Sequence, residues 1–170
     1  MRAKRLGLLV AVLLPIWATA APGPAAVPVA EDLRADARLA ARDNLVLMLV
    51  FSAYYCENCE ILENEIVRPM VISGEYDDKV IIRKVRLDEG DYLYNFKGES
   101  ELADDFAGRN GIRGMPTIMF LDHRGRRLAD PILGINTIPM FSGRVDAAIE
   151  RSLEMLRKRV RGGDRPARES

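Results

Sequence analysis

The stretch LVLMLVFSAYYCENCEIL, residues 45 to 62, decides the fold of this chain of 170 residues. Its first part, Leu45 to Ser52, is a continuous apolar run, which is typical of a strand buried on both faces of a sheet. Cys56 and Cys59, the only cysteines of the chain, follow with two residues between them. The next apolar residues recur at helical spacing, so Cys56 is predicted to lie where a strand turns into a helix.

The cysteine spacing allows three kinds of site. At a helix start, unpaired backbone N–H groups and the helix dipole favour the thiolate of Cys56, and Cys59 lies one turn further on the same face. One sulfur can then attack a substrate disulfide and the other can release the mixed disulfide. A structural disulfide would close too short a loop to remove much chain entropy, and a metal site would need further ligands from a chain with one histidine. We expect a redox pair, with the structural disulfide and the metal site as alternatives.

Outward from this stretch, apolar periodicity predicts the remaining elements. Helices are predicted over residues 31–44, 57–72, 100–110 and 139–159, and strands over 45–52, 79–87, 117–122 and around 127–129. Residues 88–98 are predicted to form a loop, and Ser100 is expected to cap the helix that follows it. This order predicts an α/β fold with a central mixed sheet of about four or five strands flanked by helices.

The first twenty residues have the three parts of a secretory signal peptide. Basic residues precede the mostly apolar run Leu6 to Trp17, and Ala18-Thr19-Ala20 provides a small-x-small cleavage pattern. The run is shorter than the roughly 20 residues of a transmembrane helix, so an uncleaved anchor is only the alternative. We expect an exported, periplasmic protein, in a compartment that permits disulfides.

Beyond the leader, the chain is predicted to form one domain. Residues 21–30 are expected to be a flexible lead-in, residues 31–160 the domain, and residues 161–170 a disordered basic tail. Three of the 25 basic residues lie in the leader, which leaves 22 basic and 25 acidic side chains. These charges do not form the broad basic face that nucleic-acid binding requires, so nucleic-acid binding is excluded. We also expect a monomer.

Two motifs in this order resemble the thioredoxin superfamily. They are FSAYYCENC, residues 51–59, and GIRGMPTIMF, residues 111–120. The resemblance implies a thioredoxin-like fold in which Met115-Pro116 has a cis peptide bond beside the cysteine pair. It places Met115, Pro116 and Thr117 at the substrate-binding surface, together with Tyr55, which stands where thioredoxin has a tryptophan. Tyr54 and Tyr55 could form an apolar rim for a substrate peptide or be ordinary packing residues.

The chain also departs from thioredoxin close to the cysteines. Glu57 and Asn58 replace a Gly-Pro dipeptide, and Val50 stands where the family carries a buried aspartate that helps deprotonate the second cysteine. The usual proton acceptor is therefore missing, and Cys59 would rely on water or on a nearby group. Lys84 matches the family's lysine near that acid, although a solvated strand lysine is the alternative.

Glu57 bears on the direction of electron flow. A negative charge beside Cys56 disfavours the thiolate and stabilises the disulfide, which favours a reductant over a strong oxidant. The alternative is that Glu57 points into solvent at the helix start. We therefore assign tuning roles to Glu57, Asn58 and Lys84.

The export signal, the cysteine pair and a longer segment before the second motif resemble the SoxW-type periplasmic thioredoxins. The expected function is an oxidoreductase that reduces disulfides in periplasmic partner proteins, with electrons from a membrane donor and with no cofactor besides the Cys56–Cys59 disulfide. A disulfide-introducing oxidase and a binding or assembly module without turnover are the alternatives. His123, seven strand residues beyond Pro116, would lie about 23 Å away and is not expected to take part.

Overall fold

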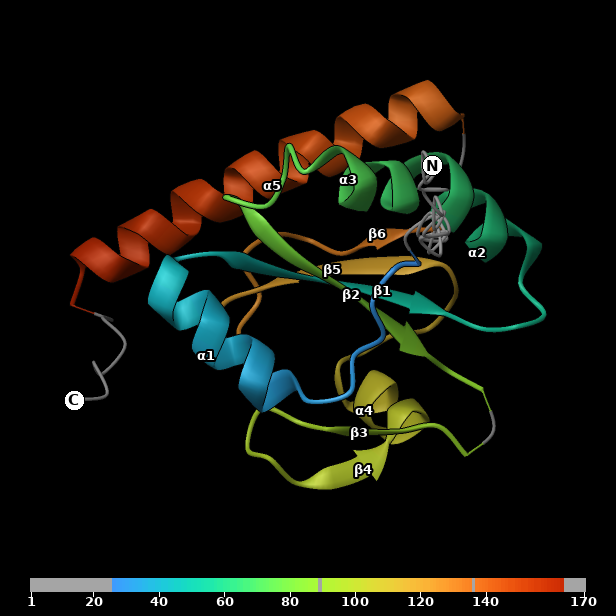
Figure 1. Ribbon diagram of the computed structural model, residues 1–170, viewed down its shortest axis with the longest axis horizontal. Helices are drawn as coiled ribbons and strands as arrows, with labels where there is room; N and C mark the ends of the chain where they lie inside the picture. Colours follow the sequence, from blue (N-terminus) through green and yellow to red (C-terminus); the bar gives the residue numbers. More distant parts are fainter. Residues whose placement is uncertain (1–25, 89, 136, 164–170) are drawn as a thin grey trace, which may run out of the picture.

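The computed structural model describes residues 26–88, 90–135 and 137–163 (Figure 1). The expected leader, residues 21–25 of the expected lead-in and most of the expected basic tail lie outside these ranges. A mixed sheet in the order β2-β1-β5-β6 forms the centre of the molecule. Its strands are β1 (Val46–Ser52), β2 (Val80–Arg86), β5 (Thr117–Leu121) and β6 (Ile132–Leu133). β1 runs parallel to β2 and antiparallel to β5, and β6 runs antiparallel to β5. The predicted α/β fold with a mixed sheet is confirmed.

Helices cover both faces of this sheet (Figure 1). One face carries α1 (Leu33–Asp43) and α4 (Ala103–Arg109). The other face carries α2 (Glu57–Leu62), the wide helical turn η1 (Glu63–Val67), α3 (Arg68–Ser73) and α5 (Ile138–Arg161). None of the described helices is long and apolar enough to cross a membrane.

Alternation along β1 explains why its apolar run is continuous. Met48 and Val50 point to the face covered by α2, α3 and α5, whereas Leu47 and Leu49 point to the face covered by α1 and α4. All four are buried, because successive side chains of a strand point to opposite faces. β1 is therefore the central strand that its composition predicts, and the cysteines follow directly from it.

Residues 27 to 30 are not the flexible lead-in that their composition suggests. The Ala30 N–H donates to the Lys84 carbonyl at 2.8 Å, and the Lys84 N–H donates to the Pro28 carbonyl at 2.7 Å. Val27 and Ala30 are buried. The segment thus pairs with backbone groups at the outer edge of β2. This pairing depends on tertiary structure, and so short a segment has no periodic side-chain pattern that would predict it.

The predicted loop and helix start over residues 88–102 are also wrong. A two-stranded antiparallel sheet forms there from β3 (Tyr92–Tyr94) and β4 (Ser100–Leu102). Ser100 pairs with Tyr94 and does not cap a helix, since α4 begins only at Ala103. The Asn95 side chain accepts hydrogen bonds from the Lys97 and Glu99 N–H groups and thereby closes the hairpin turn.

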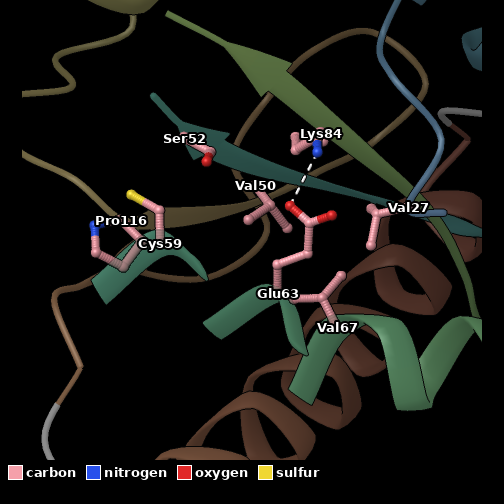
Figure 2. A pocket seen from close by; sticks show the side chains of 8 residues that line it. All are labelled: Val27, Val50, Ser52, Cys59, Glu63, Val67, Lys84 and Pro116. Atoms are coloured by element: carbon pink, nitrogen blue, oxygen red, sulfur yellow. Dashed lines mark hydrogen bonds and ion pairs between the residues drawn. The ribbon is translucent and has the colours of Figure 1, made fainter. Parts of the chain in front are cut away.

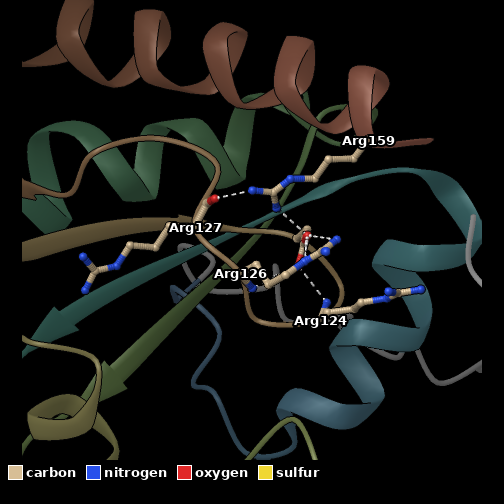
Figure 3. Close-up of polar contacts among 5 residues, drawn as sticks. Arg124, Arg126, Arg127 and Arg159 are labelled. Atoms are coloured by element: carbon tan, nitrogen blue, oxygen red, sulfur yellow. Dashed lines mark hydrogen bonds and ion pairs between the residues drawn. The ribbon is translucent and has the colours of Figure 1, made fainter. Parts of the chain in front are cut away.

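The last strand lies later than predicted. Arg127 forms only an isolated bridge with Leu121, and regular pairing resumes at β6, residues 132–133. At the turn before it, the buried carboxylate of Asp122 accepts hydrogen bonds from Arg126 and Arg159. Figure 3 shows these two arginines, one from the turn and one from the long helix. Arg159 belongs to the last turns of α5, so this contact attaches the end of the long helix to the end of β5.

Candidate redox site

The two cysteines lie at the start of α2, directly after the carboxyl end of β1. Cys56 is the N-cap residue, and its sulfur accepts a hydrogen bond from the Cys59 N–H at 3.2 Å. The two residues form a disulfide with their Cα atoms 5.1 Å apart. Unpaired N–H groups at this helix start would stabilise a negative charge on Cys56 once the disulfide opens.

The two sulfurs differ in their access to solvent. Cys56 is half-buried, whereas Cys59 exposes only 3% of its surface. A substrate can therefore reach Cys56 but not Cys59. This asymmetry fits a division of labour in which Cys56 forms the mixed disulfide and Cys59 resolves it.

The second motif places Pro116 against the cysteine pair. The Met115-Pro116 peptide bond is cis, and Pro116 lines the same small cavity as Cys59. Met115 is 38% exposed beside this contact. Thr117 is buried, and its hydroxyl donates to the Gly114 carbonyl at 2.6 Å. Thr117 thus braces the turn before Pro116, and its side chain does not face solvent.

Two exposed tyrosines precede Cys56. Tyr55 exposes 96% of its surface and Tyr54 exposes 71%, and their rings meet edge to face with centroids 4.8 Å apart. The Tyr54 N–H donates to the Asp88 carboxylate at 2.7 Å, which ties this loop to the segment after β2. The tyrosines therefore project from an anchored loop next to the attacking sulfur.

A small cavity of about 10 Å³ lies behind Cys59. It is lined by Val27, Val50, Ser52, Cys59, Glu63, Val67, Lys84 and Pro116 (Figure 2). Two of these residues carry charge: the Glu63 carboxylate and the Lys84 ammonium group form an ion pair at 2.9 Å. The side chains of Glu63 and Lys84 are only 19% and 20% exposed. Lys84 therefore lines the cavity behind Cys59 and is not a solvated strand lysine.

Glu63 is the residue that the sequence reasoning missed. It follows Cys59 by four positions, a spacing that puts two side chains on one face of a helix. Val50, which replaces the expected acid on β1, lines the same cavity, so the structure brings a carboxylate from the helix to a position where the strand has none. An acid four residues after the second cysteine was the available signal.

The helix after the cysteines contains a wide turn that begins at Glu63. Residues Glu63–Val67 form a π-helical turn between α2 and α3. Over four residues a regular α-helix turns slightly more than one revolution, whereas a π-helical turn turns slightly less, so the two offsets partly cancel along Cys59, Glu63 and Val67. Cys59, Glu63 and Val67 accordingly all line the cavity.

Two predicted tuning residues, and the histidine that is not expected to take part, lie outside this cavity. Glu57 and Asn58 are exposed in the first turn of α2. His123 lies in the turn after β5, at the opposite end of that strand from Pro116. Within residues 26–88, 90–135 and 137–163, no three His, Cys, Asp or Glu side chains cluster closely enough to hold a metal ion.

Comparison with known proteins places this geometry in a family. The family model described as a thioredoxin-like domain matches residues 33–149. The thioredoxin of Malassezia sympodialis (Mala s 13) is similar in structure, with a TM-score of 0.52 and 22% sequence identity, over 79% of this chain and 98% of that chain. Thioredoxin O2 of Arabidopsis thaliana in the oxidized state has a TM-score of 0.49 and 21% identity, over 71% and 91% of the two chains. No curated protein sequence matches the chain.

The family match and the Malassezia structure agree on the architecture. The family match covers the strand before the cysteines, the cysteine pair and the second motif, and the Malassezia structure shares the fold at low identity. The predicted thioredoxin-like fold is therefore confirmed.

Proposed function

Because the chain belongs to the thioredoxin-like family, we propose that it is an exported thiol-disulfide oxidoreductase that reduces disulfides in periplasmic partner proteins. The observation that carries this proposal is the pairing of an accessible Cys56 at a helix start with a buried Cys59 in one disulfide. Export rests on the signal-like segment of residues 1–20.

The reaction consists of two exchanges. In the dithiol form, the Cys56 thiolate attacks one sulfur of a substrate disulfide, forming a mixed disulfide and releasing the first substrate thiolate. The Cys59 thiolate then attacks the Cys56 sulfur, which re-forms the Cys56–Cys59 disulfide and releases the second substrate thiolate. Two electrons pass to the substrate, and a dithiol donor must restore the reduced protein; we place this donor in the membrane.

The direction of the reaction rests on Glu57. Glu57 is an exposed residue in the first turn of α2 and directly follows Cys56 in the chain, and negative charge near Cys56 disfavours the thiolate and so favours the disulfide. A more stable disulfide has a lower reduction potential, which suits a reductant.

The test combines a reduction potential with a turnover assay. The purified protein is equilibrated with dithiothreitol or glutathione buffers, and its free thiols are counted by mass. A potential near ~−270 mV is expected, whereas a value near ~−120 mV would identify a disulfide-introducing oxidase.

Turnover is followed with insulin as the disulfide substrate and dithiothreitol as the electron donor. The wild type is expected to reduce insulin, Cys56→Ser to be inactive, and Cys59→Ser to accumulate mixed disulfides with its substrate. If the wild type binds partners but turns over no disulfide, the protein is a binding module and the proposed enzyme activity is wrong.

A further inference from the structure

We infer that Glu63, held by Lys84, accepts the proton of the Cys59 thiol during the second exchange, through a water molecule in the cavity behind Cys59. This inference rests on the proposed function, because it concerns the step in which Cys59 releases the substrate. β1 presents Val50 to the cavity and therefore provides no proton acceptor there. The inference assigns this role to Glu63, on the helix that follows the cysteines.

The step needs an acceptor near Cys59. Only the thiolate attacks a disulfide, and burial in apolar surroundings disfavours the thiolate. Cys59 exposes only 3% of its surface, and Val50 and Pro116 line the same cavity. Bulk water therefore does not reach the Cys59 sulfur freely. A group inside the site must therefore take the proton.

Glu63 lies at the cavity behind Cys59. It lines the cavity together with Cys59, and Figure 2 shows its carboxylate directed toward Lys84 on the sheet side of that cavity. The cavity volume of about 10 Å³ is close to the lower limit for one water molecule. A general base can act through one water molecule, so a base at this cavity does not need direct contact with the Cys59 sulfur.

The surroundings of Glu63 contain two cations. Lys84 approaches it from β2 at 2.9 Å, and Arg68 approaches it from α3 at 3.6 Å. The other residues that line the cavity are apolar or are Ser52 and Cys59. Both cations form ion pairs with the Glu63 carboxylate and so orient it at the cavity.

The proton and electron changes of the step balance. Cys59 loses its proton to the Glu63 carboxylate through the water, and the resulting thiolate attacks the Cys56 sulfur of the mixed disulfide. The Cys56–Cys59 bond forms, the bond between Cys56 and the substrate breaks, and the substrate leaves as a thiolate. Glu63 then returns its proton to solvent or to the departing thiolate.

Stopped-flow reaction of the fully reduced protein with dithiobis-nitrobenzoate separates the two exchanges. The first thionitrobenzoate anion is released when Cys56 attacks the reagent, at a rate that depends on reagent concentration. The second is released when Cys59 attacks within the same molecule, at a rate independent of that concentration. Each trace therefore reports the Cys59 step with the Cys56 step as its internal reference.

For Glu63→Gln, the second phase should slow by roughly 10²-fold at about pH 7, in the range of general base catalysis, while the first phase stays within about twofold of the wild type. Above about pH 9 hydroxide removes the Cys59 proton, so the second-phase rates of Glu63→Gln and the wild type should converge. A purely structural role for Glu63 would not produce convergence. Glu60→Gln, which changes an exposed acid of the same helix, should leave both phases unchanged.

Lys84→Gln provides a second test should Glu63→Gln fold poorly. Without Lys84 the carboxylate loses its closer ion-pair partner and keeps only Arg68 on α3, so it is held less firmly at the cavity and the second phase should again slow at neutral pH. Second phases as fast as in the wild type in these variants would overturn the inference. A wild type that shows both phases but does not reduce insulin would overturn the proposed function and leave the role of Glu63 standing.

Discussion

Tyr55 is the most exposed of the large apolar side chains near the disulfide, and it directly precedes Cys56. Large aromatic rings usually bury much of their surface, and exposed ones at a functional edge often supply binding energy. Its edge-to-face contact with Tyr54 and the tie from Tyr54 to Asp88 hold the ring in place without burying it. This arrangement favours the apolar rim over the alternative that the tyrosines are packing residues.

Tyr55→Ala is expected to lower kcat/KM for insulin by about fivefold to tenfold, because the lost ring contact is worth roughly 1 kcal/mol or slightly more. The rate with oxidised glutathione should stay unchanged, since a small disulfide does not span the rim. Tyr92→Ala is the matched control, because Tyr92 is 64% exposed but lies on β3. Equal insulin kinetics for both variants and the wild type would show that Tyr55 does not contact substrate.

At the scale of elements, the β3–β4 hairpin is held by its turn and by its contact with α1. Gly98 adopts a left-handed conformation with φ +81°, and a Cβ atom there would lie 2.7 Å from the guanidinium group of Arg34. The Asn95 side chain closes the same turn with two backbone hydrogen bonds. The hairpin therefore depends on a backbone conformation that glycine adopts without cost.

Gly98→Ala is expected to lower the free energy of unfolding by about 1–2 kcal/mol, mainly through the cost of positive φ, since the long Arg34 side chain can move aside. Gly108→Ala is the control within α4, where no atom lies within 4 Å of the added Cβ. It should raise stability by up to about 1 kcal/mol. Urea unfolding of both variants measures the difference, and equal stabilities would contradict the role of the turn.

Sequence patterns predicted the elements that bury a regular face and missed those that depend on distant partners. The apolar run before Cys56 identified the central strand, because a strand buried on both faces needs apolar residues at every position. Residues 27–30 pair with β2 through backbone groups alone, which no side-chain pattern records. Likewise Val50 shows that β1 lacks an acid, and the spacing of four puts Cys59 and Glu63 on one helix face, but the packing of the helix on the sheet is what brings Glu63 to the cavity that Val50 lines.

At the scale of the whole molecule, Asp122 joins the end of β5 to the end of α5, far from the disulfide. Its carboxylate is fully buried and accepts hydrogen bonds from the Arg124 and Arg126 N–H groups and from the guanidinium groups of Arg126 and Arg159 (Figure 3). Arg159 also donates to the Arg127 carbonyl at 2.9 Å. The long helix is thus fixed at this end by charge, while its apolar residues pack on the sheet.

This contact should make stability depend on pH in the acid range. Burial alone would raise the pKa of Asp122, but hydrogen bonds from Arg126, Arg124 and Arg159 outweigh it and hold the pKa below its ordinary value. The folded state therefore binds this proton more weakly than the unfolded state does. The stabilisation is fully present above the unfolded pKa of about 3.9 and is lost as the pH falls through the folded pKa.

Asp122→Asn is accordingly expected to reduce the free energy of unfolding by about 1–3 kcal/mol at neutral pH, because the buried charge-assisted hydrogen bonds are lost. Below about pH 4 the wild type loses the same contribution, so the two urea-unfolding curves should approach each other as the pH falls. Asp130→Asn, at an exposed aspartate of the same segment, should follow the wild type at every pH. A constant difference between Asp122→Asn and the wild type across the acid range would mean that Asp122 stabilises the fold by packing and not by its charge.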